Sequence, residues 1–239
     1  MRLLVSVLGP DEAMVALAGG ADIVDVKDPA GGALGAAGPA TLRALRAIVT
    51  LPAKLSAALG DAPQLPGTFA LAAHGAAACG VDYVKVGLLG SRDDREALAL
   101  LQAVRDGAAA ADPATRVVAV AYADADRVGA FPPLRLPALA RQAGIHGVML
   151  DTCVKDGTTA IEALGESGVV TLLSAARAAG LLAGLAGALR PEDVARAAAL
   201  GAELVGVRGS ACDGGRLGRV TIARVRALRA ALGLVPAGG

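Results

Sequence analysis

One eight-residue pattern occurs four times along the chain, and it constrains the fold more than any other feature. Each copy begins with a glycine and continues into a short apolar run; the copies are Gly20–Lys27, Gly80–Gly87, Gly144–Asp151 and Gly201–Arg208. Their starts are 60, 64 and 57 residues apart. A glycine that ends a helix, followed by a turn and a buried strand, explains each copy. One step is long enough for two βα units, so the pattern predicts strands two, four, six and eight of a repeating βα fold.

Short β-branched runs alternate with Ala/Leu/Arg segments of helical period along the whole chain. The eight expected strands are 3–8, 22–27, 54–59, 82–87, 116–122, 147–151, 181–186 and 203–207. Expected helices that begin with Pro, Asp or Arg include 39–49, 93–110, 191–200 and 219–232. Strict alternation of eight strands with helices predicts one (β/α)8 TIM barrel, a single domain over residues 1–239.

The alternation of side chains along a strand assigns the two faces of each repeated strand. The Val and Leu pairs are expected to face the helices: Val24/Val26, Val84/Val86, Val148/Leu150 and Val205/Val207. The residues between them then point into the barrel. Asp25, Lys85, Met149 and Gly206 form one predicted layer, and Lys27, Gly87, Asp151 and Arg208 form the next layer toward the C-terminal mouth.

Composition excludes several classes of protein. Aromatic residues make up 2% and the net charge is +1, so neither a stacking platform nor a basic stripe for nucleic acid is present. The longest uncharged apolar stretch, 178–189, is well short of the roughly 20 residues that cross a bilayer. The N-terminus is interpreted as the first strand rather than a secretory signal, and the sequence predicts a cytoplasmic protein.

Cysteine and histidine are scarce. Cys79, Cys153 and Cys212 show no C-x-x-C spacing, and the histidines are His74 and His146. We therefore expect no disulfide framework and no metal site. The histidines are interpreted as hydrogen-bonded scaffold residues. Cys153 could lie near the site, but it is interpreted as a small buried or neutral cysteine. Residues 122–127 could either orient substrate or cap a loop.

Lysine is rare in this chain, with four residues against 19 arginines. Arginine cannot replace lysine where a neutral amine must attack a carbonyl, because its guanidinium stays protonated. Lys27, Lys85 and Lys155 fall at the predicted mouth, whereas Lys54 opens a strand at the opposite end and is given no chemical role. Asp25 is expected beside Lys85, either as a buried ion pair or as a carboxylate that tunes the lysine.

Two glycine-bearing loops are candidates for binding an anion. Gly187 follows the seventh strand, and Arg208, Gly209 and Ser210 follow the eighth. These loops form the recurrent phosphate site of TIM barrels. Tight packing of helix against strand is the alternative explanation for the glycines.

Several motifs in order resemble the (5-formylfuran-3-yl)methyl phosphate synthase family of methanofuran biosynthesis. They are 21–29 with 34–36, 60–61 with 66–68, 82–88, 122–124 with 127–130, 149–152 with 155–157, and 206–209 with Cys212. The resemblance implies that two glyceraldehyde 3-phosphate molecules condense with loss of water and one phosphate. It also implies that Lys27 forms the Schiff base, that Lys85 accepts a proton, that Lys155 and Asp151 complete the site, and that no metal or organic cofactor is needed.

Two other classes of function remain open on the sequence. A class I aldolase or another phosphosugar isomerase or lyase could use the same barrel. A catalytically silent sensor that binds a phosphosugar is the other alternative, although three lysines at the mouth of a lysine-poor chain speak against it. In every case the expected partner is a small phosphorylated molecule, and the Ala-rich outer helices favour a homo-oligomer.

Overall fold

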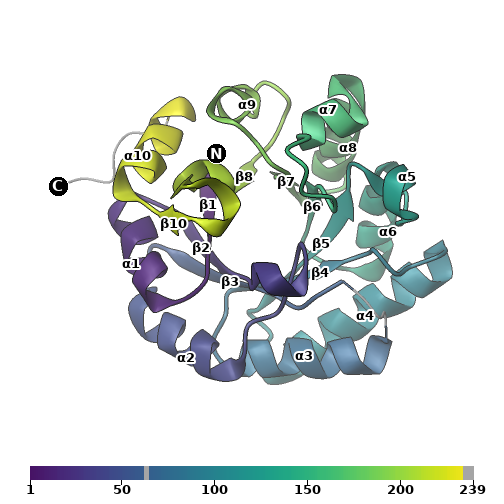
Figure 1. Cartoon of the computed structure of the whole chain (residues 1–239). Helices are drawn as coiled ribbons and strands as arrows, with labels where there is room; N and C mark the ends of the chain where they lie inside the picture. The colour runs from purple at the N-terminus through teal and green to yellow at the C-terminus, as the bar shows by residue number, and fades with distance from the viewer. Residues whose placement is uncertain (62–64, 234–239) are drawn as a thin grey trace.

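The computed structural model describes residues 1–61 and 65–233. Eight parallel strands pair in chain order, and β8 pairs with β1 to close a barrel (Figure 1). The strands are β1 (Arg2–Val7), β2 (Ile23–Val26), β3 (Lys54–Ala58), β4 (Tyr83–Gly87), β5 (Arg116–Tyr122), β6 (Gly147–Asp151), β7 (Leu182–Leu185) and β8 (Leu204–Val207). Each matches an expected strand to within about a residue at either end. The predicted TIM barrel is therefore confirmed.

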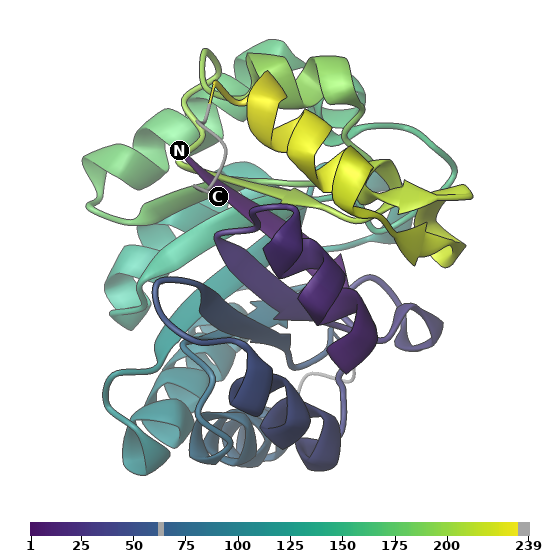
Figure 2. The ribbon, with the colours of Figure 1, turned by 90° about the vertical axis from the view of Figure 1, so that its left-hand side faces the viewer.

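Helices surround the barrel. They are α1 (Pro10–Ala18), α2 (Pro39–Ile48), α3 (Pro66–Ala78), α4 (Asp94–Ala111), α5 (Ala125–Val128), α6 (Leu136–Ala143), α7 (Ala160–Leu164), α8 (Glu166–Ala178), α9 (Pro191–Arg196) and α10 (Ile222–Ala231). In the chain, α1 to α9 lie between successive barrel strands, and α10 follows the last of them. Several helices begin with proline, which suits a first helical residue because its missing N–H would have no partner there. The first and last helices lie side by side and close the ring (Figures 1 and 2). No helix in the described ranges is both long enough and apolar enough to cross a membrane.

Two of the expected helices have different bounds in the structure. The helix expected over 191–200 ends at Arg196, and the following residues form turns. The helix expected from residue 219 begins at Ile222, because 219–220 form a strand, β10 (Arg219–Val220), that pairs with β9 (Cys212–Asp213). Glycines at 214, 215 and 218 allow the tight turn between these strands. Thr221 then caps the helix by accepting a hydrogen bond from the Arg224 N–H.

The fourfold repeat has a structural explanation in two of its positions. The leading glycine of every copy adopts a positive φ, from 70° to 94°, as a residue that ends a helix often does. The polar residue two positions later accepts a hydrogen bond from a backbone N–H at the start of the preceding strand. The four pairs are Asp22 with Leu3, Asp82 with Leu55, His146 with Val117 and Glu203 with Ala183. These bonds tie each even strand to its odd neighbour at the end of the barrel opposite the mouth.

The barrel divides the core into two apolar clusters. The larger cluster lies between strands and helices and contains every Val and Leu that was expected to face outward. The smaller cluster fills the barrel interior with Leu4, Ile23, Tyr83, Val118, Met149 and Leu204 among its members. The assignment of the two strand faces is thus confirmed. Polar side chains occupy the interior mainly in the layers closer to the mouth.

Candidate active site

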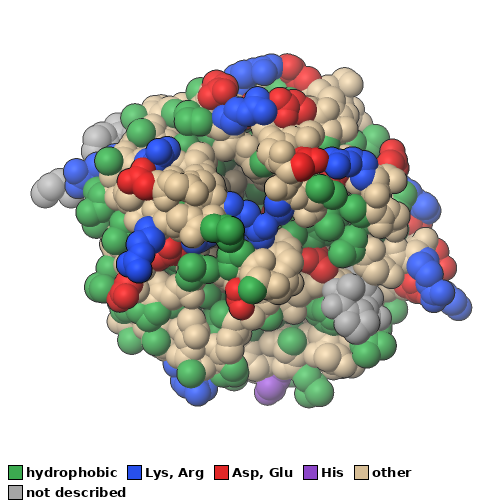
Figure 3. All heavy atoms as spheres, viewed as in Figure 1, with side chains coloured by type: hydrophobic (Ala, Val, Ile, Leu, Met, Phe, Trp, Pro, Cys, Tyr) green, Lys and Arg blue, Asp and Glu red, His purple; other side chains and the backbone are tan. Residues whose placement is uncertain are grey.

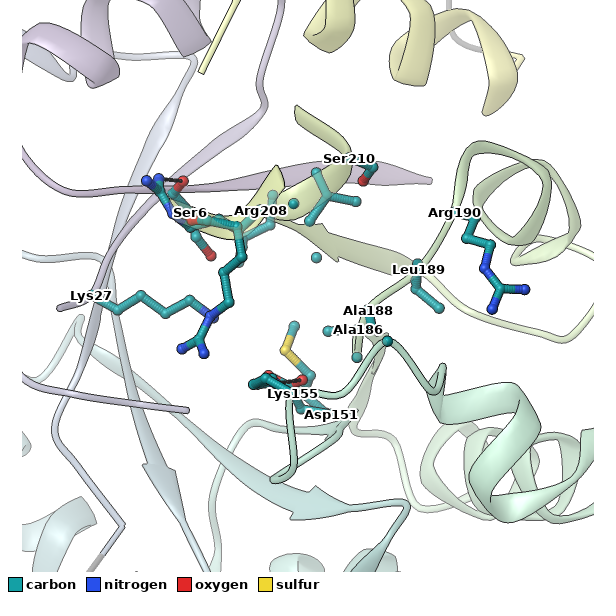
Figure 4. A pocket seen from close by; sticks show the side chains of 18 of the residues that line it. Ser6, Lys27, Asp151, Lys155, Ala186, Ala188, Leu189, Arg190, Arg208 and Ser210 are labelled. Atoms are coloured by element: carbon teal, nitrogen blue, oxygen red, sulfur yellow. Dashed lines mark hydrogen bonds and ion pairs between the residues drawn. The ribbon is translucent and has the colours of Figure 1, made fainter. Parts of the chain in front are cut away.

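A cavity of about 330 Å³ opens at the carboxyl ends of the strands. Figure 3 shows Lys and Arg side chains gathered at the hollow in the centre of this face. In Figure 4, Lys27 enters the cavity from one side and Arg190 lies on the other, with Asp151 and Lys155 between them. The lining contains all but one of the predicted site residues: Lys27, Lys85, Asp151, Lys155, Gly187, Arg208, Gly209 and Ser210. The exception, Asp25, lies beneath Lys85.

Lys27 directly follows β2, and its side chain reaches into the cavity (Figure 4). The residue is only 8% exposed, and no hydrogen bond or ion pair within residues 1–61 and 65–233 involves its ammonium group. Burial is the main cause that lowers the pKa of Lys27 to about 8, against the opposing charge of Asp151. Roughly a tenth of such an amine is neutral at pH 7, compared with well under a thousandth of an ordinary lysine. Lys27 is therefore suited to attack an aldehyde carbon.

Lys85 and Asp25 form an ion pair inside the barrel. Lys85 Nζ lies 2.6 Å from Asp25 Oδ2, and both side chains are almost completely buried. The same carboxylate accepts hydrogen bonds from the Ser6 and Ser56 hydroxyls at 3.0 and 2.8 Å. Three donors satisfy the buried charge, as an interior carboxylate requires. The buried ion pair expected for these two residues is present, and Lys85 also lines the cavity above it.

Lys155 and Asp151 form a second pair at the rim. Asp151 ends β6, and Lys155, in the loop that follows, donates to Asp151 Oδ1 at 2.9 Å and to the Thr152 carbonyl. Burial alone would raise the pKa of Asp151, but the charges of Lys155 and Lys27 lower it to about 2. The site therefore keeps an ionised carboxylate within electrostatic reach of Lys27.

The two loops that were predicted to bind phosphate lie at the cavity, although their residues differ in whether their N–H groups are free to bind an anion. Gly187, Gly209 and Ser210 line it. A Cβ at Gly187 would lie 2.9 Å from the Thr152 N, so packing alone already requires glycine there. Arg208 donates its five N–H groups to protein acceptors, namely Glu12, Ser6 O, Arg216 O and Gly218 O. Its assignment as a phosphate ligand stays a prediction.

A carboxyl group that the sequence reasoning did not single out occupies the place of a missing side chain. Gly87 is the one residue without a side chain in the layer nearest the mouth, and a Cβ there would overlap the Asp61 carboxyl and approach the Tyr122 hydroxyl. Tyr122 donates a hydrogen bond to Asp61. Burial raises the pKa of Asp61, although the Tyr122 hydrogen bond lowers it. Gly60-Asp61 is one of the motifs that resemble the family, and this resemblance was the one sequence feature that could have pointed to Asp61.

His146 and the segment 122–127 have the structural roles that were expected, whereas His74 is exposed on α3 and makes no side-chain hydrogen bond within the described ranges. The Nδ1 of His146 accepts the Val117 N–H at 3.1 Å, as a scaffold residue would. Asp124 accepts the N–H groups of Cys153 and Val154 at 2.7 and 2.8 Å, so segment 122–127 does cap a loop. Burial raises the pKa of the Cys153 thiol, which keeps it neutral. Within the described ranges, no group of three or more His, Cys, Asp or Glu side chains is placed to hold a metal ion.

Sequence comparisons extend over most of the chain. A family model described as 4-HFC-P synthase matches residues 3–229. The (5-formylfuran-3-yl)methyl phosphate synthase of Methanopyrus kandleri is 45% identical over 221 residues, which cover 92% of this chain and 93% of the relative. The protein of the same name from Methanobrevibacter smithii is 44% identical over 215 residues, with 90% and 91% covered.

Structural comparison gives a more distant similarity. The phosphoribosyl anthranilate isomerase of Thermus thermophilus matches with a TM-score of 0.65 at 18% identity, and the match covers 98% of each chain. At that identity the likeness shows the TIM-barrel fold and nothing about the reaction.

Proposed function

The chain belongs to the 4-HFC-P synthase family, and from that membership we propose that it condenses two molecules of glyceraldehyde 3-phosphate to (5-formylfuran-3-yl)methyl phosphate. In this reaction two three-carbon aldehyde phosphates give one six-carbon furan phosphate, one inorganic phosphate and two molecules of water. The observation that carries the proposal is the state of Lys27. It is the lysine of the cavity without a carboxylate partner in the described structure, whereas Lys85 and Lys155 are both ion-paired.

In the first proposed step, the neutral amine of Lys27 attacks the aldehyde carbon, and the adduct loses water to give a protonated imine. The imine withdraws electrons and so acidifies the adjacent C–H. The nearby Asp151 carboxylate stabilises the cationic imine as it forms. A surface lysine would be protonated and hydrated, so burial of Lys27 favours this step.

Removal of the acidified proton is assigned to Lys85. Lys85 must give up a proton before it can accept one, and the Asp25 carboxylate at 2.6 Å is the acceptor within reach. The resulting enamine adds to the aldehyde carbon of the second molecule. Lys155, held by Asp151 and the Thr152 carbonyl, is a charged donor at the rim for the oxygen that becomes negative in this addition. Attack of a hydroxyl oxygen on the carbon that carries Lys27 then closes the ring and releases the lysine amine, and loss of phosphate and of one further water aromatises the ring.

The proposal is tested by trapping the imine. We expect purified protein, glyceraldehyde 3-phosphate and borohydride to give a reduced adduct on the peptide that contains Lys27. Without borohydride, a furan chromophore should appear in the ultraviolet. Lys27→Arg should abolish both signals because a guanidinium stays protonated. The matched control is Lys54→Arg, which changes the lysine at the opposite end of the barrel that pairs with Asp82 at 2.8 Å, and it should keep both.

The other possible outcomes separate the alternatives. An adduct on Lys27 with an open-chain sugar phosphate and no furan absorbance would replace the proposal with a class I aldolase. If the wild-type protein gave neither adduct nor product, the result would favour a phosphosugar-binding protein without catalytic activity. A furan product formed equally by Lys27→Arg would contradict the Schiff-base mechanism.

A further inference from the structure

The cationic side chains of the cavity fall into two groups. Among the residues that the structure describes, six line it. Four of these are ion-paired: Lys85 with Asp25 at 2.6 Å, Lys155 with Asp151 at 2.9 Å, Arg190 with Glu162 at 2.9 Å and Arg208 with Glu12 at 2.7 Å. Within residues 1–61 and 65–233, Lys27 and Arg216 have no carboxylate partner. An unpaired cation at a partly buried site is costly unless a ligand uses it. Lys27 has a proposed role, and Arg216 has none so far.

Arg216 lies in the turn between β9 and β10, which are inserted between the eighth strand and the last helix. The guanidinium donates one hydrogen bond within the described structure, from Nη2 to the Gly32 carbonyl at 3.0 Å. Gly32 belongs to the loop after β2, which also carries Lys27 at its start. The turn therefore reaches across the mouth toward the lysine side of the cavity, and the other N–H groups of Arg216 remain available for a ligand.

Arg208 holds this turn in place. Its Nε donates to the Arg216 carbonyl at 3.0 Å, and its Nη2 donates to the Gly218 carbonyl at 3.2 Å. Glu12 of α1 accepts from Arg208, and it also accepts from the Val220 N–H; its side chain is 13% exposed. Arg208 thus connects the first helix, the first strand and the inserted hairpin. All five of its N–H groups have protein acceptors here, so a phosphate could bind Arg208 directly only by displacing one of them.

We propose that Arg216 binds a phosphate group of the substrate, and that Arg208 is a positioning residue that holds the hairpin carrying Arg216. The inference deepens the proposed function and rests on it for the identity of the substrate. A guanidinium is planar and can donate two parallel N–H bonds to phosphate oxygens. Gly209 and Ser210 line the same cavity next to the hairpin, so their backbone can add donors.

The first test uses inorganic phosphate and requires no turnover. We would titrate inorganic phosphate into three proteins and measure its affinity by calorimetry. The proteins are the wild type, Arg216→Gln and Arg219→Gln, and each variant removes one positive charge from the same hairpin. Arg219 is the matched control because it is exposed and does not line the cavity. Loss of a charged donor should weaken phosphate binding by about tenfold to a hundredfold in R216Q. The control should stay within twofold of wild type. Equal affinity in R216Q and wild type would overturn the inference.

The second test asks whether the phosphate belongs to the substrate. Borohydride trapping on Lys27 is followed against the concentration of glyceraldehyde 3-phosphate and, separately, of glyceraldehyde. We expect R216Q to raise the half-saturating concentration for the phosphorylated aldehyde about tenfold or more and to leave that for glyceraldehyde unchanged. An equal rise for both aldehydes would overturn the assignment to a substrate phosphate. If wild-type protein traps neither aldehyde, the proposed function fails, and the phosphate titration still decides whether Arg216 binds an anion.

A third variant separates positioning from binding. Arg208→Lys keeps the charge but cannot bridge Glu12, Arg216 O and Gly218 O together. It should weaken phosphate binding and also speed amide hydrogen exchange over residues 212–220. R216Q should weaken binding without that change in exchange. Wild-type exchange in R208K would contradict the positioning role. R216Q decides the ligand assignment even if R208K does not fold.

Discussion

Lys85 Nζ lies 2.6 Å from Asp25 Oδ2 at the centre of the barrel, where the two side chains are 4% and 0% exposed. The Asp25 carboxylate also accepts both the Ser6 and Ser56 hydroxyls. With these two serines, the pair connects four strands, β1 to β4, through side chains and supports the floor of the cavity. Its energetic role differs from that of the surface ion pairs, because removal of one partner leaves a buried charge behind.

Asp25→Asn should destabilise the protein by about 3 to 5 kcal/mol, because the Lys85 ammonium would lose its buried counter-ion. Urea unfolding followed by circular dichroism measures the change. Glu166→Gln is the control, since Glu166 and Arg196 form a half-exposed pair, and it should cost less than about 1 kcal/mol. A cost for D25N no larger than that of the control would contradict this description of the pair.

Reaction of Lys27 with an amine-specific reagent should rise with pH to a midpoint near 8, because only the neutral amine reacts and its pKa is about 8. Asp151→Asn removes a negative charge that favours the ammonium form, so it should move the midpoint to lower pH. Peptide mass spectrometry across a pH series gives both curves. Asp106→Asn, on the exposed surface of α4, should leave the midpoint unchanged. A midpoint near 10.5 in the wild-type protein would disagree with burial as the cause.

Tyr122→Phe should destabilise the fold by about 1 to 3 kcal/mol, because the largely buried Asp61 carboxyl would lose a hydrogen-bond donor. Tyr83→Phe removes a hydroxyl that bonds to Arg2 near the opposite end, at 3.2 Å, and should cost less. Denaturant midpoints of the two variants give the comparison. Equal costs would mean that the Asp61 contact adds nothing beyond an ordinary hydroxyl.

The Glu12 and Arg208 pair should stabilise the protein in a pH-dependent way. Burial would raise the pKa of Glu12, but hydrogen bonds from Arg208 and Leu8 lower it below 4.5. A lowered folded-state pKa gives stability that is complete above pH 4.5 and is lost as pH falls through the folded-state value. Glu12→Gln should therefore cost about 3 kcal/mol at pH 7 and less at pH 3.5. A gap between wild type and E12Q that does not shrink on acidification would refute the linkage.

Gly87→Ala tests the site more directly than the stability variants do. The added methyl group would occupy the position of the Asp61 carboxyl, so Asp61 and Tyr122 must move away from the mouth layer. We expect at least a tenfold loss of furan formation with Lys27 trapping retained, because Lys27 follows β2 whereas Gly87 ends β4. The matched variant is Gly67→Ala on α3, where an added Cβ meets nothing within 4 Å. Full activity in G87A would exclude a role for the Asp61 position.

The strands, their inward and outward faces and the lysines at the mouth could all be predicted from the sequence. These features depend on local periodicity: side chains alternate along a strand, and a glycine ends each helix before it. The position of Lys27 follows from the same alternation, since it lies two residues after Asp25. The repeated pattern then placed Lys85 and Asp151 on strands of the same kind.

The tertiary structure alone decided which polar groups meet. The Arg208 guanidinium forms an ion pair with Glu12, which is 196 residues away in the chain. The Arg216 side chain donates a hydrogen bond to the Gly32 carbonyl, which is 184 residues away. Asp61 occupies the space over Gly87 because Gly60, the residue before it, accepts the Gly87 N–H at 3.1 Å. The partners of long flexible side chains and loops depend on which groups the fold brings close and on which charges compete for them. The periodicity of residues along a strand predicts neither.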